Sequence, residues 1–292
     1  MRNIKFSQNF VKNQGLIESL IKASSISKND LVFDIGAGTG EITDVLRKYS
    51  KEVIAIEKDK KLYNDLRKRF ELASNVRVVN QDILNYNFPA DKNYKIFSNI
   101  PFNYTADIIC KLSEQKRLAE DIYLFAQKQA ILKYLGKSTE TMKSLLIKVY
   151  FKPTIVHRFK RNDFKPSPRV EVVLLRLERL KAPLIDKNDS VEWKNFVVYG
   201  FSQFKSTLKK GFSKIFTDKQ FRRLAKDLKF NLKAKPTHLS IDQWMSLYNF
   251  FKDTIEVSKK NLIRDSYSQL LKQQNSLSKI HRTRSDKDWK TK

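Results

Sequence analysis

The sequence predicts an α/β fold built on an open sheet, followed by a smaller all-helical region and a basic tail. An apolar strand candidate at residues 31–35 runs directly into a glycine-rich loop and a helical pattern. Short apolar runs and helical patterns then alternate as far as residue 177, which is typical of an open α/β sheet. After Leu180 the apolar spacing is helical throughout. We therefore expect three parts, at residues 1–180, 181–256 and 257–292.

The chain is strongly basic. It holds 58 Lys and Arg against 31 Asp and Glu, a formal net charge of +27, while 41% hydrophobic residues suffice for a folded core. Such an excess of positive charge opposes compact folding through self-repulsion, and it usually indicates a polyanionic partner. Nucleic acid is the leading candidate for this partner, and an anionic membrane is the second. No run approaches eighteen apolar residues, and the start of the chain lacks the apolar core of a signal peptide. We expect a soluble, cytoplasmic protein that binds nucleic acid and no membrane.

Cysteine and histidine are too few and too scattered for a disulfide framework or a metal cluster. The one cysteine, Cys110, lies in an apolar helical stretch, where a thiol is far more often a small buried side chain than a nucleophile. His157, His238 and His281 have no ligand spacing. We therefore expect no metal.

The start of the chain carries a polar and aromatic stretch, residues 5–10, before helical periodicity begins at Leu16. An ordered arm in this stretch would place Asn9 across a bound cofactor. A frayed terminus is the alternative, which this stretch alone favours.

Three glycines at alternate positions, Gly36, Gly38 and Gly40, separate the first strand from the helix that follows. Glycine lets the backbone approach a ligand closely at a helix N-terminus. The next strand candidate, residues 52–56, ends in Glu57, whose carboxylate can accept hydrogen bonds from two ribose hydroxyls. The order of strand, loop, helix, strand and acid indicates a nucleoside-cofactor site.

The spacing of the glycines distinguishes between cofactors. Dinucleotide sites have G-x-G-x-x-G, whereas this loop is G-x-G-x-G after Asp34 and shows no pyrophosphate cradle. A third strand candidate, residues 76–80, is followed by Asp82, whose carboxylate can bond an adenine amino group. A helix or turn cap is the equally weighted alternative for Asp82. Glu57 and Asp82 together would hold an adenosyl group without phosphate contacts.

The fourth strand candidate, residues 94–98, is followed by the tetrad Asn99, Ile100, Pro101 and Phe102. In an open α/β sheet, ligands bind at this edge. The Asn oxygen and a backbone carbonyl can accept both N–H bonds of an amino-bearing base, while the aromatic ring stacks on its face. Taken alone, the tetrad is more simply a proline turn with Phe102 in the core. The rest of the chain favours the base-binding interpretation.

A proline-rich loop precedes the last strand candidate. The remaining elements of the first part are predicted at residues 121–125, 128–135, 141–149 and 170–177, the middle two as helices. Pro166 and Pro168 predict an extended loop that holds Phe164 near the sheet edge. A mere connector is the alternative.

Beyond a polar linker that ends at Ser190, the pattern is wholly helical. Helices are expected at residues 193–204, 208–216, 221–228 and 241–251. Residues 205–235 contain eleven Lys or Arg against two Asp, and residues 257–292 contain ten against three. A charge run is usually a solvated face, but beside a cofactor fold a phosphate-binding surface is favoured. The Gln, Ser and Lys of the last stretch predict partial disorder.

Together these motifs resemble the rRNA adenine N6-methyltransferases, the superfamily of the Erm macrolide-resistance 23S rRNA enzymes and of the KsgA-type dimethyltransferases. The resemblance covers about residues 2–251 and rests on residues 7–10, the loop at 34–40, Glu57, Asp82, the Asn99 tetrad and residues 164–170. It implies a Rossmann-like class I S-adenosylmethionine-dependent methyltransferase sheet of seven strands, the last antiparallel, with a small helical domain. The cofactor would be S-adenosyl-L-methionine and the product S-adenosyl-L-homocysteine.

The same resemblance implies roles for individual residues. The residues around the cofactor would be Asn9, Val11, Gly36, Gly38, Glu57, Asp82 and Asn99. The catalytic set would be Asn99, Ile100, Pro101, Phe102 and Phe164. In that set the Asn99 side chain and the Ile100 carbonyl hold the target amine, Phe102 stacks on a flipped adenine, and Phe164 covers its other face.

Two departures from the KsgA pattern favour the Erm type. The KsgA type usually reads Asn-Leu-Pro-Tyr and has three successive prolines in the late loop, whereas this chain has Asn-Ile-Pro-Phe and Ser167 between Pro166 and Pro168. The expected partner is therefore 23S rRNA before full subunit assembly, modified by a monomer with one or two methyl groups, giving macrolide resistance. KsgA-type 16S rRNA dimethylation is the alternative. So is a non-catalytic RNA-binding factor, against which the intact glycine loop and Asn99 argue.

Overall fold

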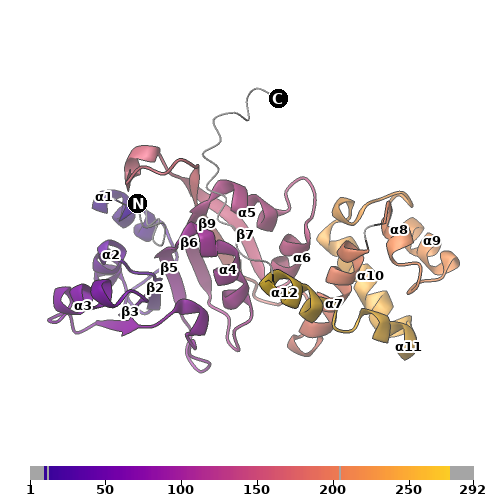
Figure 1. The fold of residues 1–292 in the computed structure, drawn as a ribbon, viewed down its shortest axis with the longest axis horizontal. Coiled ribbons are helices and arrows are strands. Elements are labelled where there is room, and N and C mark those ends of the chain that lie inside the picture. The colour runs from indigo at the N-terminus through magenta and orange to yellow at the C-terminus, as the bar shows by residue number, and fades with distance from the viewer. Residues whose placement is uncertain (1–9, 12, 204, 277–292) are drawn as a thin grey trace.

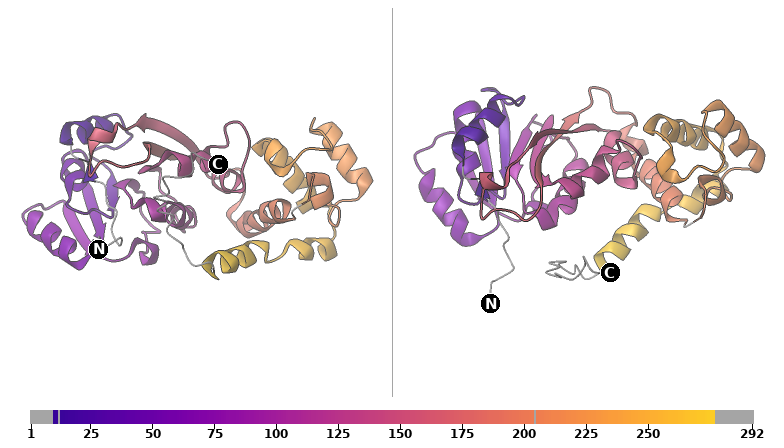
Figure 2. Two further views of the ribbon diagram at one scale, coloured as in Figure 1. Left: turned by 45° about the horizontal axis from the view of Figure 1, so that its top comes forward. Right: turned by 90° about the horizontal axis from the view of Figure 1, so that it is seen from above.

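The computed structural model describes residues 10–11, 13–203 and 205–276. Figures 1 and 2 show an elongated molecule with a sheet-bearing part at one end and an all-helical part at the other. No helix within the described residues is both long and apolar enough to cross a membrane.

The main sheet has seven strands in the order β4-β3-β2-β5-β6-β9-β7. They are β2 (Leu31–Ile35), β3 (Glu52–Glu57), β4 (Val76–Asn80), β5 (Lys95–Asn99), β6 (Asp121–Gln127), β7 (Phe151–Arg158) and β9 (Val172–Arg179). The first five are parallel in register, and β9 runs antiparallel to both β6 and β7. The predicted Rossmann-like sheet of seven strands, with its last strand antiparallel, is confirmed.

Helices cover both faces of this sheet because successive side chains of a strand point to opposite faces. Val32 and Phe97 pack on one face with α1 (Gln14–Lys22) and α2 (Glu41–Tyr49). Their neighbours Phe33 and Ile96 pack on the other face with α4 (Thr105–Ser113) and α5 (Lys128–Leu135). The remaining helices of this part are α3 (Lys60–Arg69) and α6 (Met142–Lys148).

Strand β7 is an element for which the residue pattern provided no signal. It contains Pro153, together with Lys152, His157 and Arg158, so its sequence does not alternate cleanly. Proline is tolerated because β7 lies at the edge of the sheet, where one side of the strand needs no ladder partner. Pairing with β9 stabilises β7, and the register shifts between Ile155 and His157.

The described residues after β9, as far as residue 276, contain helices and no further strand. They form α7 (Ser190–Ser202), α8 (Leu208–Gly211), α9 (Asp218–Asp227), α10 (Ile241–Thr254), α11 (Val257–Lys260) and α12 (Ser266–Ser276). Capping boxes of the form Thr-x-x-Gln and Ser-x-x-Gln begin α9 and α10 at Thr217 and Ser240. Gly200 lets α7 lie close to α10, since a Cβ at this position would lie 2.6 Å from the ring of Trp244 on α10.

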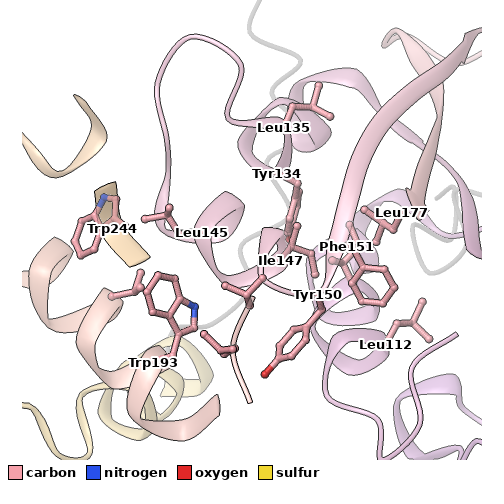
Figure 3. Close-up of a cluster of buried hydrophobic side chains, with 14 of the residues drawn as sticks. Leu112, Tyr134, Leu135, Leu145, Ile147, Tyr150, Phe151, Leu177, Trp193 and Trp244 are labelled. Carbon is pink, nitrogen blue, oxygen red and sulfur yellow. The ribbon is translucent and has the colours of Figure 1, made fainter. Parts of the chain in front are cut away.

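One apolar core runs from the sheet into the helical part. Figure 3 shows Phe151 and Leu177 of the sheet continuing through Leu145 and Ile147 of α6 to Trp193 on α7. All five side chains are buried. The two parts are therefore joined by packed side chains and not only by the linker.

The stretch after residue 256 differs from the expected tail. Residues 257–276 form α11 and α12, and Ile263 between them is buried in the common core. The predicted partial disorder is not tested for residues 277–292, which lie outside the described residues. The boundaries at residues 180 and 256 remain predictions.

Candidate functional site

A cavity of about 360 Å³ lies at the carboxyl ends of β2, β3 and β5, the edge at which parallel sheets bind ligands. Residues from several loops line it, among them Gly36, Glu57, Lys58, Asp82, Ile83, Pro101 and Tyr104. The structure therefore brings Gly36 of the glycine loop, both predicted acids and Pro101 of the tetrad to one cavity.

The glycine loop takes a left-handed backbone that only glycine adopts without strain. The φ angles are +68° at Gly36, +58° at Gly38 and +87° at Gly40. The N–H groups of Gly36 and Ala37 both donate to the Ile56 carbonyl, at 2.7 and 3.1 Å, which ties the loop to β3. At Gly40 a Cβ would lie 2.7 Å from Leu66, so the beginning of α2 is packed tightly against α3.

Glu57 is buried and held at both carboxylate oxygens. Oε2 accepts a hydrogen bond from the Gly38 N–H at 2.9 Å, and Oε1 accepts one from the Asp59 N–H at 2.9 Å. Each carboxylate oxygen has a second lone pair. The side chain can therefore accept further hydrogen bonds from a ligand while its position stays fixed.

Asp34 lies on β2, two residues before Gly36, and is fully buried. Burial, assisted by the Glu57 charge, raises the pKa of its carboxyl to about 7, although the hydrogen bond that Thr43 Oγ1 donates at 2.6 Å opposes both effects. At neutral pH part of the Asp34 population therefore keeps its proton, which reduces the negative charge around Glu57.

Asp82 fulfils the cap alternative and also faces the cavity. Its Oδ1 accepts from the Leu84 N–H at 3.0 Å, which caps the 3₁₀ turn Ile83–Asn85, and its Oδ2 accepts from Lys58 Nζ at 2.6 Å. Burial alone would raise the pKa of Asp82, but the hydrogen bond from Lys58 lowers it. An ionised carboxylate thus lines the same cavity as Gly36, and its predicted bond to adenine stays a prediction.

The tetrad follows directly on β5. Asn99 is the last residue of the strand and is half-buried, while Ile100 is buried. Pro101 lines the cavity 3.7 Å from where a Gly36 Cβ would lie. Phe102 begins the 3₁₀ turn Phe102–Tyr104, is half-buried, and packs on a buried cluster that includes Val11 and Phe164. Phe102 is therefore neither a free surface residue nor a fully buried core residue.

Val11 and Phe164 face each other in a small second sheet formed by β1 (Phe10–Val11) and β8 (Phe164–Lys165). Phe164 is fully buried, with its ring 5.3 Å from that of Phe159. The late loop therefore reaches the start of the chain beside the tetrad. In this structure Phe164 belongs to the cluster that supports Phe102, and its predicted cover over a base stays a prediction. Asn9 lies outside the described residues.

Several cavity residues gave no clear signal of their own in the sequence. Lys58, Gln81, Asn103 and Tyr104 all line the cavity. Each lies within two residues of a predicted site residue, and this proximity was the available signal. Tyr104 stays 38% exposed at the cavity.

The family model for ribosomal RNA adenine dimethylases matches residues 1–253. This chain belongs to that family. It is an S-adenosylmethionine-dependent rRNA adenine N6-methyltransferase of the Erm and KsgA superfamily, as the motifs predict.

Individual relatives agree with this assignment. An rRNA adenine N-6-methyltransferase of Streptococcus sanguinis is 31% identical over 252 residues, which is 86% of this chain and 96% of the relative. A ribosomal RNA small subunit methyltransferase A of Mycoplasmopsis pulmonis is 26% identical over 84% of this chain and 96% of its own length. The fold resembles the solved 23S rRNA methyltransferase ErmE, with a TM-score of 0.74 and 20% identity, covering 84% of this chain and 100% of ErmE.

The cavity residues of this methyltransferase fit S-adenosylmethionine. Carboxylates at Glu57 and Asp82 provide acceptors for hydroxyl and amino groups, and Ile83 and Pro101 provide apolar wall for a planar base. The described lining contains a single cation, Lys58, which is engaged by Asp82, so it is not built like a pyrophosphate site.

Proposed function

We propose that this enzyme transfers one or two methyl groups to the exocyclic amine of an adenine in 23S rRNA, within the macrolide-binding region. The result would be resistance to macrolide, lincosamide and streptogramin B antibiotics. The observation that supports the proposal is the place of the tetrad. Pro101 lines the cofactor cavity, while Asn99 and Ile100 immediately precede it at the end of β5.

In this proposal Asn99 and Ile100 align and polarise the amine and no residue acts as a strong base. The amine of adenine is a poor nucleophile because its lone pair is delocalised into the ring. The Asn99 oxygen and the Ile100 carbonyl accept its two hydrogens, which favours a pyramidal nitrogen with a directed lone pair. S-adenosylmethionine supplies an already activated methyl group.

Phe102 supplies the stacking surface for the target base. Moving the base out of its stack costs a few kcal/mol. Stacking on an aromatic side chain returns roughly 1 to 3 kcal/mol per base. Because Phe102 packs on the buried cluster that holds Phe164, its ring is supported from behind. We assign Phe164 to the adenine pocket through this support.

We assign the cofactor contacts to Asn9, Val11, Gly36, Gly38, Glu57, Asp82 and Asn99. The cavity supports this assignment for Gly36, Glu57 and Asp82, which line it. Gly38 contributes through its hydrogen bond to Glu57. Val11 contributes through the cluster beneath Phe102.

Two sequence features favour 23S over 16S rRNA. Phe102 stands where the KsgA type usually has Tyr, and Ser167 interrupts the prolines of the late loop. We further propose that the enzyme acts in the cytoplasm, as a monomer, on rRNA that is not yet fully assembled into a subunit.

Expression in a macrolide-sensitive bacterium tests this proposal. Wild-type protein should raise the macrolide concentration needed to inhibit growth, and primer extension on 23S rRNA should stop at one adenine. An Asn99→Ala variant expressed to the same level should do neither. Unchanged drug sensitivity with unmodified 23S rRNA, despite soluble wild-type protein, contradicts the proposal.

KsgA-type dimethylation of 16S rRNA is the second candidate. The 26% identity to a small subunit methyltransferase A over nearly its whole length favours it. Primer-extension stops on 16S rRNA alone would support this candidate. Titration with S-adenosylmethionine separates both enzymes from a non-catalytic RNA-binding factor, which would not bind it.

A further inference from the structure

Helix α12 and the segment before it lie beyond the part of the chain that the family shares. The family model ends at residue 253, and the Streptococcus sanguinis relative is matched over 96% of its length by 252 residues of this chain. The described structure continues to residue 276. Residues 254–276 therefore add something that the shared fold does not require.

This extension packs against the helical part through α7. The Tyr267 N–H donates to Oδ1 of Asn195 at 3.0 Å, and Asn195 is itself buried. Lys194 Nζ lies 5.0 Å from the centre of the Tyr267 ring, within the range of a cation–π contact. Ile263, just before α12, is buried in the common core.

The same tyrosine also contacts the sheet-bearing part. Its hydroxyl donates to Oε1 of Glu114 at 2.9 Å, and Glu114 caps the C-terminus of α4. Lys194 Nζ donates to that same oxygen at 2.5 Å, and the Tyr267 hydroxyl lies 3.5 Å from Cys110 Sγ. This one carboxylate oxygen thus accepts a hydrogen bond from a residue of α7 and another from a residue of α12. Figure 1 shows α12 across the junction between the two parts.

Helix α4 leads directly to the tetrad. The turn Phe102–Tyr104 runs into α4 without a break, and Thr105 Oγ1 donates to the Phe102 carbonyl at 2.9 Å. A shift of α4 would therefore move Phe102. Helix α7 leads into the basic helical part, where residues 205–235 carry eleven Lys or Arg.

The composition of α12 argues against a direct RNA contact. It carries one lysine, Lys272, and neither Arg nor acidic residues, in a chain whose net charge is +27. Tyr267, Leu270 and Leu271 are half-buried on it, whereas Gln269, Lys272 and Gln273 are exposed. Such a helix suits packing against the protein better than phosphate binding.

We propose that α12 is an interdomain brace and that Tyr267 is a positioning residue, which holds the basic helical part at a set angle to α4 and the tetrad. The inference rests on the proposed function, because the rRNA must contact the helical part and Phe102 at once. A brace reduces the freedom that binding would otherwise have to remove, and so tightens RNA binding without contacting RNA.

Three variants test the brace. Tyr267→Ala removes the ring and the hydroxyl, Tyr267→Phe removes only the hydroxyl, and Gln269→Ala is the control on the exposed side of the same helix. In the full-length protein we would measure amide hydrogen exchange in α4 and α7, affinity for S-adenosylmethionine, and KM and kcat for an rRNA fragment.

Tyr267→Ala should speed exchange at the end of α4 and raise KM for RNA, each by about tenfold, with kcat and cofactor affinity within about twofold of wild type. Tyr267→Phe should lie between Tyr267→Ala and wild type, and Gln269→Ala should match wild type. Unchanged exchange in Tyr267→Ala would overturn the brace. An unchanged KM, with exchange raised, would overturn the positioning role.

Two further measurements keep the test decisive. If Tyr267→Ala does not fold, a double-mutant cycle between Tyr267→Phe and Glu114→Gln decides. A coupling in KM and in exchange supports the brace, and strict additivity overturns it. If the wild-type chain methylates no rRNA, the proposed function has failed, while hydrogen exchange still reports on the brace by itself.

Discussion

The backbone N–H of Gly38 donates a hydrogen bond to the buried carboxylate of Glu57, 2.9 Å away. This contact joins the loop after β2 to the end of β3, where the Asp59 N–H holds the second oxygen of the same carboxylate. One carboxylate therefore fixes the loop after β2 and the end of β3 relative to each other, beside the cavity that Glu57 lines.

Substitution of Glu57 should weaken both cofactor binding and the loop. Glu57→Ala removes the acceptor for two backbone N–H groups and the proposed acceptor for a ribose hydroxyl, so affinity for S-adenosylmethionine should fall by roughly 1 to 3 kcal/mol. Asp82→Ala should weaken cofactor affinity within the same range. It should reduce the free energy of unfolding less than Glu57→Ala does, because Asp82 is only partly buried and its ion-pair partner Lys58 is exposed. Calorimetry with the cofactor and urea unfolding separate the two effects.

Asp65→Ala provides the control for these variants, since Asp65 is exposed on α3 and does not line the cavity. Its cofactor affinity should equal that of wild type. Wild-type affinity in both Glu57→Ala and Asp82→Ala would contradict the assigned cofactor contacts.

Variants of the tetrad should separate chemistry from folding. Asn99→Ala removes the acceptor that we propose aligns the amine, so methyl transfer should fall at least about a hundredfold. In Phe102→Ala the rate of methyl transfer should fall by a similar factor. The free energy of unfolding should also fall, by roughly 1 to 2 kcal/mol, which is less than for a fully buried Phe because the Phe102 ring is half-buried. Phe102→Tyr should retain activity. Single-turnover methylation and urea unfolding provide the two readouts.

The two outcomes for Phe102 differ clearly. If Phe102→Ala unfolds the protein, yet the fraction that stays folded transfers methyl groups at the wild-type rate, Phe102 is a core residue and no stacking surface. A wild-type rate in Asn99→Ala would remove the amide from the mechanism.

The sequence predicted the local elements that carry the proposed site residues. The strand before Gly36, the alternate glycines and Glu57 follow one another within a single strand-helix-strand unit, where backbone conformation and strand alternation act over short distances. The tetrad was recognisable for the same reason, because Asn99 to Phe102 lie side by side.

The remaining features depend on partners that are distant in the chain. The burial of Phe164 depends on Val11 and Phe159, and Val11 lies more than a hundred residues before it. The order in α12 depends on Asn195 and Glu114, which Tyr267 meets only in the folded protein. The Gln and Ser around Tyr267 predict a partly disordered tail from composition alone. The contacts with Asn195 and Glu114 leave no local pattern in the sequence from which they could be predicted.

Asp34 should make stability depend on pH in an unusual direction. Burial raises its pKa to about 7 from an ordinary value of 3.8. Below the ordinary value both folded and unfolded chains hold the proton. As the pH rises from about 4 to about 7, the unfolded chain ionises first, so the free energy of unfolding falls. Asp34→Asn cannot ionise and should lose less stability than wild type over this range.

Urea unfolding of the ligand-free protein at steps from about pH 5 to about pH 8 measures this difference. Carboxylates with lowered pKa, such as Asp30 and Glu41, lose their stabilising effect only below this window, so they affect both proteins equally. In the Asp34→Asn variant the side-chain amide oxygen can still accept the hydrogen bond from Thr43. Parallel curves for the two proteins would show that Asp34 does not titrate in this range.

The last stretch of the chain should contribute charge to RNA binding, separately from the packing role of α12. Residues 277–292 hold six Lys or Arg and two Asp, a net charge of +4, and no motif residue. Each phosphate contact that their deletion removes should flatten the slope of log K against log salt by about 0.7 to 0.9. Cofactor affinity and the choice of adenine should persist, because base identity is recognised in the pocket and phosphate contacts mainly position the RNA.

A second deletion, of residues 266–292, separates charge from bracing. It also removes α12, which carries only one lysine, so the salt slope should change little further while RNA affinity falls at every salt concentration. Affinity for an rRNA fragment across a salt series, for the full chain and both deletions, measures both quantities. Equal slopes for the full chain and the shorter deletion would mean that residues 277–292 make no phosphate contacts. A longer deletion that changed the slope but not the affinity at high salt would place α12 on the RNA instead of at the domain junction.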